Sequence, residues 1–414
     1  MQKQSLLIIG AVCVEPNSSA AGKRMLQLIH QFLERDYQIT FATTTQKSEN
    51  AFDLISLGIT EVLIELNATS FDDFIKDLQP NIVLFDRFMT EEQFGWRVAE
   101  NSPNSLRILD TEDLHCLRKT RELCFKKNID FSVDALLKQD ITKREVASIL
   151  RCDLSLIIST FEMDLLKNTF KIEENILLYL PFLFDEIFKH QQKKLKSFEE
   201  RDHFIFIGNF FHKPNVDAVL TLKTQIWTTI RKQLSKAELH IYGAYMNQQI
   251  QELHNQKEGF IIKGFAENAN EVVENAKIVL APLNFGAGIK GKLTEAMLCG
   301  TPSITTSIGK EGMCGNFPWN GFIEDNYLEF SEKAVLLYND ADLWEKSKKN
   351  GFEIINHFYN KEKNGKLFFN KLDEIQHNLL KHRTHNFLGS LLQHQTIQAT
   401  KYMSKWIEAK NSKK

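Results

Sequence analysis

The chain has 414 residues, more than one hydrophobic core usually supports, so two domains are the first expectation. Hydrophobic residues make up 43% of it and charged residues 25%, which is typical of a soluble globular protein. Its 51 lysines and arginines nearly balance 53 aspartates and glutamates, and this excludes a nucleic-acid partner that is recognised by charge.

Cysteines and apolar runs indicate the compartment. The six cysteines include no Cys-x-x-Cys pair, so we expect neither disulfides nor a zinc site, and a reducing cytoplasm fits. The N-terminal apolar run imitates a secretion or lipoprotein signal, but it is short and follows a single basic residue, which favours a buried strand. No run approaches the roughly 20 residues that span a bilayer, and the run at 176–184 contains a proline.

In chain order, residues 1–187 contain short runs that are apolar throughout, separated by amphipathic segments. Such runs predict strands buried on both faces of a parallel, doubly wound sheet. The predicted strands are SLLIIGAV (5–12), QITFATT (38–44), EVLIEL (61–66), NIVLFD (81–86), RILDT (107–111), LSLIIS (154–159) and NILLYLP (175–181).

A charged stretch interrupts this rhythm and predicts a linker at residues 188–203. The rhythm returns over residues 204–375, where Pro214 suits the first turn of a helix. The predicted strands there are HFIFIGN (203–209), ELHIYG (238–243), GFIIKGF (259–265), KIVLAPL (277–283) and TPSITT (301–306). The sequence therefore predicts an α/β protein in which two Rossmann-like domains face each other across a cleft.

Residues 376–414 predict a helical tail with one apolar face, formed by Leu388, Leu391, Leu392, Met403, Trp406 and Ile407 at three- and four-residue spacings. The first alternative is a helix that packs back on the body. The second is a helix that contacts a membrane surface or a partner, because this end is basic through Lys401, Lys405, Lys410, Lys413 and Lys414.

The stretch GAGIKGKLTEAMLCGTP (286–302) lies where ligands bind in open α/β sheets, between a strand and a helix that Gly300 ends. Gly286 and Gly288 let the backbone approach an anion, and the helix start offers unpaired amides. Lys290 or Lys292 can neutralise a phosphate. Glu295, a turn further along, suits the hydroxyl groups of a ribose.

These residues resemble a known family. The stretch 285–313 is similar to the donor-site signature of retaining glycosyltransferases with the GT-B fold, and most like family 4. Residues 207–219 and 239–243 resemble the first strand–helix unit and next strand of that family's second domain, and residues 15–44 resemble its N-terminal glycine loop. The resemblance implies transfer of a sugar from a nucleotide-diphosphate sugar, with retained anomeric configuration and no further cofactor.

By position, Glu295 matches the second, ribose-binding glutamate of the family's Glu-x7-Glu motif, but Ala287 stands where the first should lie. The family's Arg and Lys pair is reduced to His212 and Lys213, so Lys290 becomes the leading phosphate contact. Glu311 either binds sugar hydroxyls or is an exposed loop residue. The implied donor-binding set is Gly22, Lys23, Asn209, His212, Lys213, Gly243, Phe265, Gly286, Ala287, Gly288, Ile289, Lys290, Lys292 and Glu295.

In the first half, the charged run RILDTEDLHCLRKTRE (107–122) follows a strand. It reads either as a capped, solvated helix or as a site in which His115 faces the cleft near the sugar, as a histidine often does in this family. The expected catalytic residues are then His115, Lys290 and Glu311. Asp86 and Arg87 sit where acceptor loops belong, although an ordinary strand–helix junction explains them too.

No metal is expected, because these carboxylates and the histidine lack a second cluster, and GT-B enzymes stabilise the leaving diphosphate with helix dipoles and basic residues. Two alternatives stay open: a GT-B protein that binds a nucleotide without transfer, and a nucleotide-sugar epimerase. A dinucleotide dehydrogenase is disfavoured, since EPNSSAAGKR replaces GxGxxG after the first strand. The family's habit suggests bacterial surface polysaccharide or glycoconjugate synthesis, in the cytoplasm or at the inner membrane face.

Overall fold

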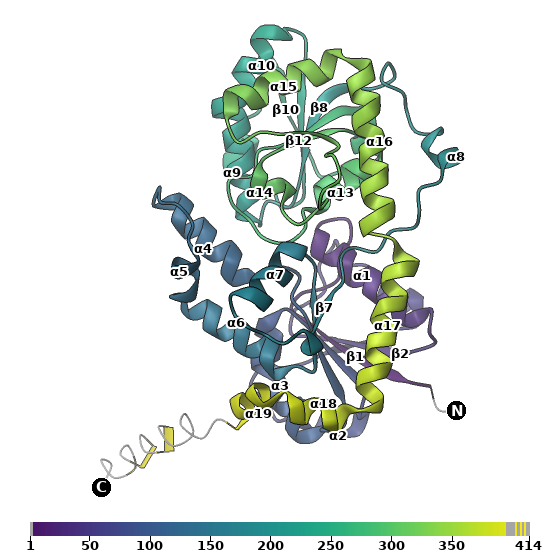
Figure 1. Cartoon of the computed structure of the whole chain (residues 1–414), viewed down its shortest axis with the longest axis vertical. Coiled ribbons are helices and arrows are strands. Elements are labelled where there is room, and N and C mark those ends of the chain that lie inside the picture. Colours follow the sequence, from purple (N-terminus) through teal and green to yellow (C-terminus); the bar gives the residue numbers. More distant parts are fainter. Residues whose placement is uncertain (1–2, 395–401, 404–405, 408–409, 411–414) are drawn as a thin grey trace.

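The computed structural model describes residues 3–394, 402–403, 406–407 and 410. They form two α/β domains, one above the other in Figure 1, each built around a fully parallel sheet. The first sheet has the order β3-β2-β1-β4-β5-β6-β7 and the second β10-β9-β8-β11-β12-β13. The predicted architecture is confirmed.

All seven strands predicted in the first half are present: β1 (Ser5–Gly10), β2 (Gln38–Thr43), β3 (Thr60–Leu63), β4 (Ile82–Asp86), β5 (Leu106–Asp110), β6 (Leu154–Ile157) and β7 (Leu177–Tyr179). The central strands β4, β5 and β6 are buried at every position, as runs that are apolar throughout require. The edge strand β3 has no buried residue.

Helices cover both faces of the first sheet: α1 (Ala20–Leu33), α2 (Ser70–Leu78), α3 (Phe88–Asn101), α4 (His115–Lys126), α5 (Val133–Leu137), α6 (Asp140–Arg151) and α7 (Thr160–Asn168), with short turns η1 (Leu54–Leu57) and η2 (Glu174–Ile176). Helix α1 begins where Ser19 caps it by accepting a hydrogen bond from the amide of Gly22. Its Leu28, Ile29 and Phe32 then pack on one face of the sheet.

The second sheet contains the five predicted strands, β8 (Asp202–Ile207), β9 (Leu239–Tyr242), β10 (Phe260–Gly264), β11 (Ala276–Ala281) and β12 (Ser303–Thr305), and the unpredicted edge strand β13 (Gly321–Ile323). Its helical elements are α9 (Lys213–Thr221), η3 (Leu222–Ile226), α10 (Trp227–Gln233), α11 (Gln248–Gln251), α12 (Ala269–Asn275), α13 (Gly291–Leu298), α14 (Ser307–Lys310), α15 (Tyr327–Asn339) and α16 (Ala341–Phe358). Trp227 and Trp344 are fully buried in this domain's core.

The domain boundaries differ from the prediction in two places. The stretch predicted as the linker, 188–203, contains the short helix α8 (Lys189–Gln192), and β8 already begins at Asp202. The sequence predicts that the second domain runs to residue 375, whereas α17 (Lys361–His377) returns to the first domain (Figure 1). There Phe368 and Phe369 pack edge-on against Phe32.

The described part of the tail packs back on the first domain through α18 (Leu379–His385) and α19 (Phe387–Gln393). Asn386 caps α19 and donates a hydrogen bond from Nδ2 to the carbonyl oxygen of Leu150 at 2.7 Å. Of the predicted apolar face, Leu388, Leu391, Met403, Trp406 and Ile407 are exposed. Lys401, Lys405, Lys413 and Lys414 lie outside the described residues.

Candidate functional site

A cavity of about 520 Å³ lies between the two domains and contains the residues that the sequence singled out. In each sheet the strand order reverses once, between β1 and β4 and between β8 and β11. Parallel strands bind ligands at these switch points, beyond their carboxyl ends. The cavity is lined by the segments that follow the strands of both sheets, so the two switch points share one space.

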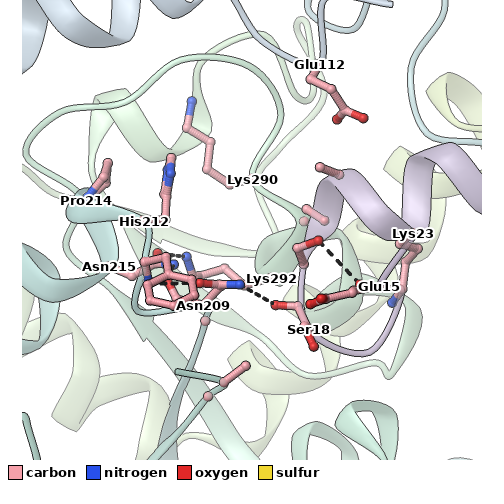
Figure 2. Close-up of a pocket in the computed structure, with 18 of the residues that line it drawn as sticks. Glu15, Ser18, Lys23, Glu112, Asn209, His212, Pro214, Asn215, Lys290 and Lys292 are labelled. Atoms are coloured by element: carbon pink, nitrogen blue, oxygen red, sulfur yellow. Dashed lines mark hydrogen bonds between the residues drawn. The ribbon is translucent and has the colours of Figure 1, made fainter. Parts of the chain in front are cut away.

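The loop from β1 to α1 forms the wall on the first-domain side (Figure 2). It folds so tightly that a Cβ on Gly22 would lie 2.3 Å from the carbonyl oxygen of Glu15, so only glycine fits there. Two contacts hold the loop to the second domain: Asn209 Nδ2 donates to the carbonyl oxygen of Ser18 at 3.2 Å, and the Tyr245 hydroxyl donates to Glu15 Oε2 at 2.8 Å.

The loop from β11 to α13 forms the opposite wall. Gly288 has a left-handed backbone with φ +62° and donates its amide to Glu162 Oε1 of the first domain at 2.9 Å. Gly291 starts α13 so close to α1 that a Cβ there would lie 2.7 Å from the Cβ of Ala20. The glycines of this stretch therefore allow close approach of the two domains.

Lys290 and Lys292 are the cations of this loop. Lys290 is buried and donates from Nζ to the carbonyl oxygen of Gly288 at 2.7 Å. Lys292 donates to Asn215 Oδ1 at 2.6 Å. Burial lowers the pKa of both lysines to about 8, although Glu311 and Glu295, respectively, oppose the change. Each ammonium group therefore lacks the compensation that an anion would supply.

Glu295 lies one turn into α13, lines the cavity and forms an ion pair with Lys23 of α1. Both side chains are partly exposed, at 15% for Glu295 and 27% for Lys23. Such a pair is readily exchanged for other partners, because partial exposure limits its net stabilisation. Glu295 is therefore positioned to accept hydrogen bonds from a ligand once Lys23 moves.

On the first-domain side, His115 begins α4 and lines the cavity with its Nε2 3.3 Å from Asp113 Oδ1. Burial lowers the pKa of His115 to about 4 against the attraction of Asp113, so the imidazole is neutral at pH 7. Arg118 donates to the same carboxylate at 2.6 Å, and its positive charge holds the pKa of Asp113 well below its usual range despite burial. His212, facing from the second domain, has a pKa lowered to about 3 by burial.

Glu112 is a poorly satisfied polar group of the cavity. It adopts a left-handed backbone, φ +61°, and its Oε1 is buried without a hydrogen-bond partner in the described part of the chain. Burial, together with Asp110 and Asp86, raises the pKa of Glu112 well above its ordinary value. A buried polar atom without a partner and a strained backbone are both typical of sites that await a ligand.

Most predicted site residues line this cavity: His115, Lys290, Lys23, Asn209, His212, Gly243, Phe265, Gly286, Ala287, Ile289, Lys292, Glu295 and Arg87. Five do not: Glu311, Lys213, Gly22, Gly288 and Asp86. Gly22 and Gly288 shape the backbone behind the wall.

The other three are engaged elsewhere. Glu311 accepts hydrogen bonds from Arg121 at 2.7 and 2.8 Å, so it is not an exposed loop residue, and its predicted role as a sugar ligand stays a prediction. Arg121 also donates to the carbonyl oxygen of Gly286, which makes this pair a brace for the loop. Lys213 pairs with Glu122 at 3.0 Å, and the buried Asp86 accepts from the amide of Ala11 at 3.0 Å.

The predicted sets omitted several lining residues, among them Glu15, Ser18, Glu112, Arg118, Asn215 and Tyr245. Glu112 and Arg118 belong to the charged run at 107–122. Nothing in the sequence marks Tyr245. Among residues 3–394 and the few described beyond them, no group of three or more His, Cys, Asp and Glu side chains could hold a metal ion, and no helix is long and apolar enough to cross a membrane.

Comparison with known proteins identifies the fold. Residues 201–340, which include every strand of the second sheet, match the family model described as glycosyl transferases group 1. No curated protein matches the chain at a significant level. The resemblance to glycosyltransferases is thus confirmed for this region, whereas the retaining mechanism and the finer assignment to family 4 stay predictions.

Three solved structures are similar over most of both chains. Sucrose-phosphate synthase from Thermosynechococcus elongatus is 14% identical, with 90% of this chain and 99% of that chain covered and a TM-score of 0.67. A variant of S. aureus TarM with fondaparinux, α-GlcNAc-glycerol and UDP is 12% identical, with 89% and 99% covered and a TM-score of 0.67. Anabaena HepE with UDP-glucose is 11% identical, with 89% and 99% covered and a TM-score of 0.63. The fold is GT-B.

Proposed function

We propose that the protein is a retaining glycosyltransferase that moves a sugar, of hexosyl type, from a nucleotide-diphosphate sugar to an acceptor without a metal ion. The observation that carries the proposal is the pair of lysines, Lys290 and Lys292, whose pKa burial lowers at the start of α13, inside the cavity that both switch points share. Two poorly compensated cations beside a helix start form an anion site.

The nucleotide would lie on the second domain. The diphosphate would contact Lys290 and Lys292, and the ribose hydroxyls would replace Lys23 as the hydrogen-bond partners of Glu295. The loop that precedes Lys23 would close over the phosphates from the first domain. The structures of HepE with UDP-glucose and TarM with UDP support this arrangement by analogy of fold.

Bond cleavage at the anomeric carbon passes through an oxocarbenium-like state and leaves negative charge on the diphosphate. Lys290, Lys292 and the start of α13 would stabilise that charge. The leaving phosphate would take the acceptor's proton on the same face, which retains the configuration and requires no base from the protein. His115, neutral at pH 7, would hydrogen-bond to a sugar hydroxyl.

The acceptor would approach from the first domain, past Arg87 and Glu112, which line the cavity on that side. Surface polysaccharide or glycoconjugate synthesis at the cytoplasmic membrane face is the setting we propose, with the basic tail as a peripheral contact. The exposed apolar side chains Leu388 and Leu391 on α19 support such a contact.

The test is transfer from radiolabelled UDP-, GDP- and ADP-sugars to glycan, lipid and peptide acceptors, with hydrolysis as the fallback reaction. We expect one donor to be consumed, an α-configured donor to give an α-linked product by NMR, and Lys292→Met to lose most of the rate. If no donor is transferred or hydrolysed, the enzyme assignment fails.

Ala287 favours a second candidate, a GT-B protein that binds a nucleotide sugar without transferring it. The family's first glutamate belongs at this position, and Ala287 offers only a methyl group to the cavity. This candidate predicts tight binding of one nucleotide sugar, with no cleavage of its sugar–phosphate bond to free the nucleotide over hours. The glycosyltransferase predicts release that depends on Lys292.

A further inference from the structure

A second cavity, of about 410 Å³, lies at the opposite end of the first domain from the nucleotide cleft. It lies beneath the amino ends of β5 and β6, where α18 and α19 of the tail pack on the domain (Figure 1). Three arginines line it: Arg107 of β5, Arg151 at the end of α6 and Arg383 of α18. Asp153 is the carboxylate among its lining residues.

Two of these arginines are already paired. Arg383 donates from Nε and Nη2 to the two oxygens of Asp153, both at 2.7 Å, and also donates to the carbonyl oxygens of Pro103 and Ser105. Arg151 forms a two-bond pair with the buried carboxylate of Glu91, with its Nε 2.9 Å from Oε1. These pairs use both nearby carboxylates, and Arg151 Nη1 donates no hydrogen bond to a residue that the structure describes.

Arg107 is the cation without a carboxylate of its own, because it shares Asp153, at ion-pair distance, with Arg383. Its side chain is 9% exposed, and its guanidinium donates no hydrogen bond to any residue that the structure describes. Its Nε is buried without a partner, and the nearest carboxylate oxygen, Oδ2 of Asp153, lies 3.6 Å away. The three arginines face two carboxylates, those of Glu91 and Asp153, so one positive charge is not balanced. A guanidinium cannot lose its proton at neutral pH, so only an anion or water entering the cavity can satisfy Arg107.

We propose that this cavity is a binding site for a phosphate group, distinct from the nucleotide cleft. The planar guanidinium of Arg107 matches two oxygens of a phosphate, and the free Nη1 of Arg151 offers a donor to a third. A bound phosphate would join the sheet, through Arg107, to the tail helices that close the cavity. Occupancy therefore stabilises the docked tail.

The phosphate can come from a soluble phosphate compound or from a phospholipid headgroup. The two tail helices that close the cavity carry exposed apolar side chains: Leu380 is 82% exposed, Phe387 68% and Leu391 55%. Arginines beside exposed apolar groups suit the surface of an anionic membrane as well as a soluble ligand. The chemistry is the same, and experiment separates the sources.

Two variants isolate the site. Arg107→Met keeps the length and apolar contacts of the side chain but removes the surplus charge. Arg144→Met is the matched control, because Arg144 pairs with Glu92 on the exposed side of α6 and lines neither cavity. Retained nucleotide binding in the cleft shows that Arg107→Met is folded. If it does not fold, Arg107→Lys replaces it, since an ammonium keeps the charge but loses the two-bond geometry.

The full chain is titrated with inorganic phosphate and glycerol 3-phosphate by calorimetry and thermal unfolding, with the nucleotide cleft filled by a saturating nucleoside diphosphate. It is also tested for co-flotation with vesicles of neutral lipid, with and without phosphatidylglycerol. We expect binding to at least one of these probes, unchanged in Arg144→Met and weakened tenfold or more in Arg107→Met or Arg107→Lys. Soluble phosphate binding alone identifies a metabolite site, and vesicle binding that glycerol 3-phosphate displaces identifies a headgroup site. No binding of either kind, or equal binding by wild type and the Arg107 variant, overturns the proposal.

Discussion

The two lysines of the β11–α13 loop should make diphosphate binding depend on pH. In the free protein, burial lowers the pKa of both Lys290 and Lys292 to about 8, from an ordinary 10.5. A bound diphosphate compensates the ammonium charge and restores the higher pKa. Binding therefore takes up protons whenever the pH lies above 8.

The magnitude follows from the difference between the free and bound pKa values. At pH 9, a lysine with a pKa of about 8 is protonated in roughly one molecule in ten, so the affinity falls by about tenfold per lysine, or about 1.4 kcal/mol. Because the two groups lie close together and interact, we expect a total loss of between about tenfold and a hundredfold from pH 7.5 to pH 9. The terminal phosphate is fully ionised over this range, so the ligand adds little of its own.

The assay is calorimetric titration of the nucleoside diphosphate in buffers of different ionisation enthalpy, which counts the protons taken up. We expect uptake near zero at pH 7 and approaching one proton per lysine at pH 9. In the controls Lys290→Arg and Lys292→Arg, the guanidinium stays charged, so each should remove its share of the uptake. An affinity that is constant from pH 7.5 to 9, without proton uptake, would refute the reasoning.

The same pKa values predict the opposite pH dependence for the stability of the free protein. Between pH 8 and 10.5 the unfolded chain binds more protons at Lys290 and Lys292 than the native fold does. The free energy of unfolding should therefore rise with pH in this window, other groups being equal, while the affinity for the diphosphate falls. If the free energy of unfolding and the affinity for the diphosphate both fell as the pH rose, the cause would be local unfolding instead.

Three further substitutions test the frame around the site. Arg24→Met should lower the free energy of unfolding by about 3–5 kcal/mol in urea titrations, because it leaves the fully buried Asp110 without its partner at 2.8 Å. Adding Asp110→Asn should restore part of this loss. Full stability of Arg24→Met would contradict the argument. Gly291→Ala should weaken donor binding by about tenfold, since the new Cβ would lie 2.7 Å from the Cβ of Ala20 and hold the two domains apart. Adding Ala20→Gly to the same chain should restore binding. If binding is not restored, this steric contact is not the cause of the weaker binding. Glu112→Ala should raise the acceptor KM by about tenfold to a hundredfold, which corresponds to the loss of one or two hydrogen bonds, and leave the donor affinity unchanged. In Glu112→Gln the acceptor KM should stay within a few-fold of the wild-type value. An unaltered acceptor KM in Glu112→Ala would contradict the assignment of Glu112 to the acceptor site.

The strands could be read from the sequence, the central ones because burial on both faces leaves an uninterrupted apolar run. The exception is β13, whose three residues are only half-buried at the sheet edge and give no such run. The β11–α13 loop was also readable, since its glycines and lysines are neighbours in the chain.

Contacts between distant segments could not be read in this way. Helix α17 is apolar on one face, but the pattern does not say which domain that face meets. The Lys23–Glu295 pair joins positions 272 residues apart, and Arg121 of the first domain likewise meets Glu311 of the second. Glu112 was hidden for another reason: an acidic residue after a strand usually caps a helix, and its left-handed backbone appears only in three dimensions.

The most direct test of the account is calorimetric binding of UDP, GDP, ADP and CMP to the wild type, Lys292→Met and Glu295→Gln. We expect one nucleoside diphosphate to bind with an affinity that falls at least about tenfold in each variant, since one variant removes a phosphate contact and the other a ribose contact. The absence of binding to every nucleotide, or binding that both variants retain, would contradict the assignment of this cavity to a nucleotide-sugar donor.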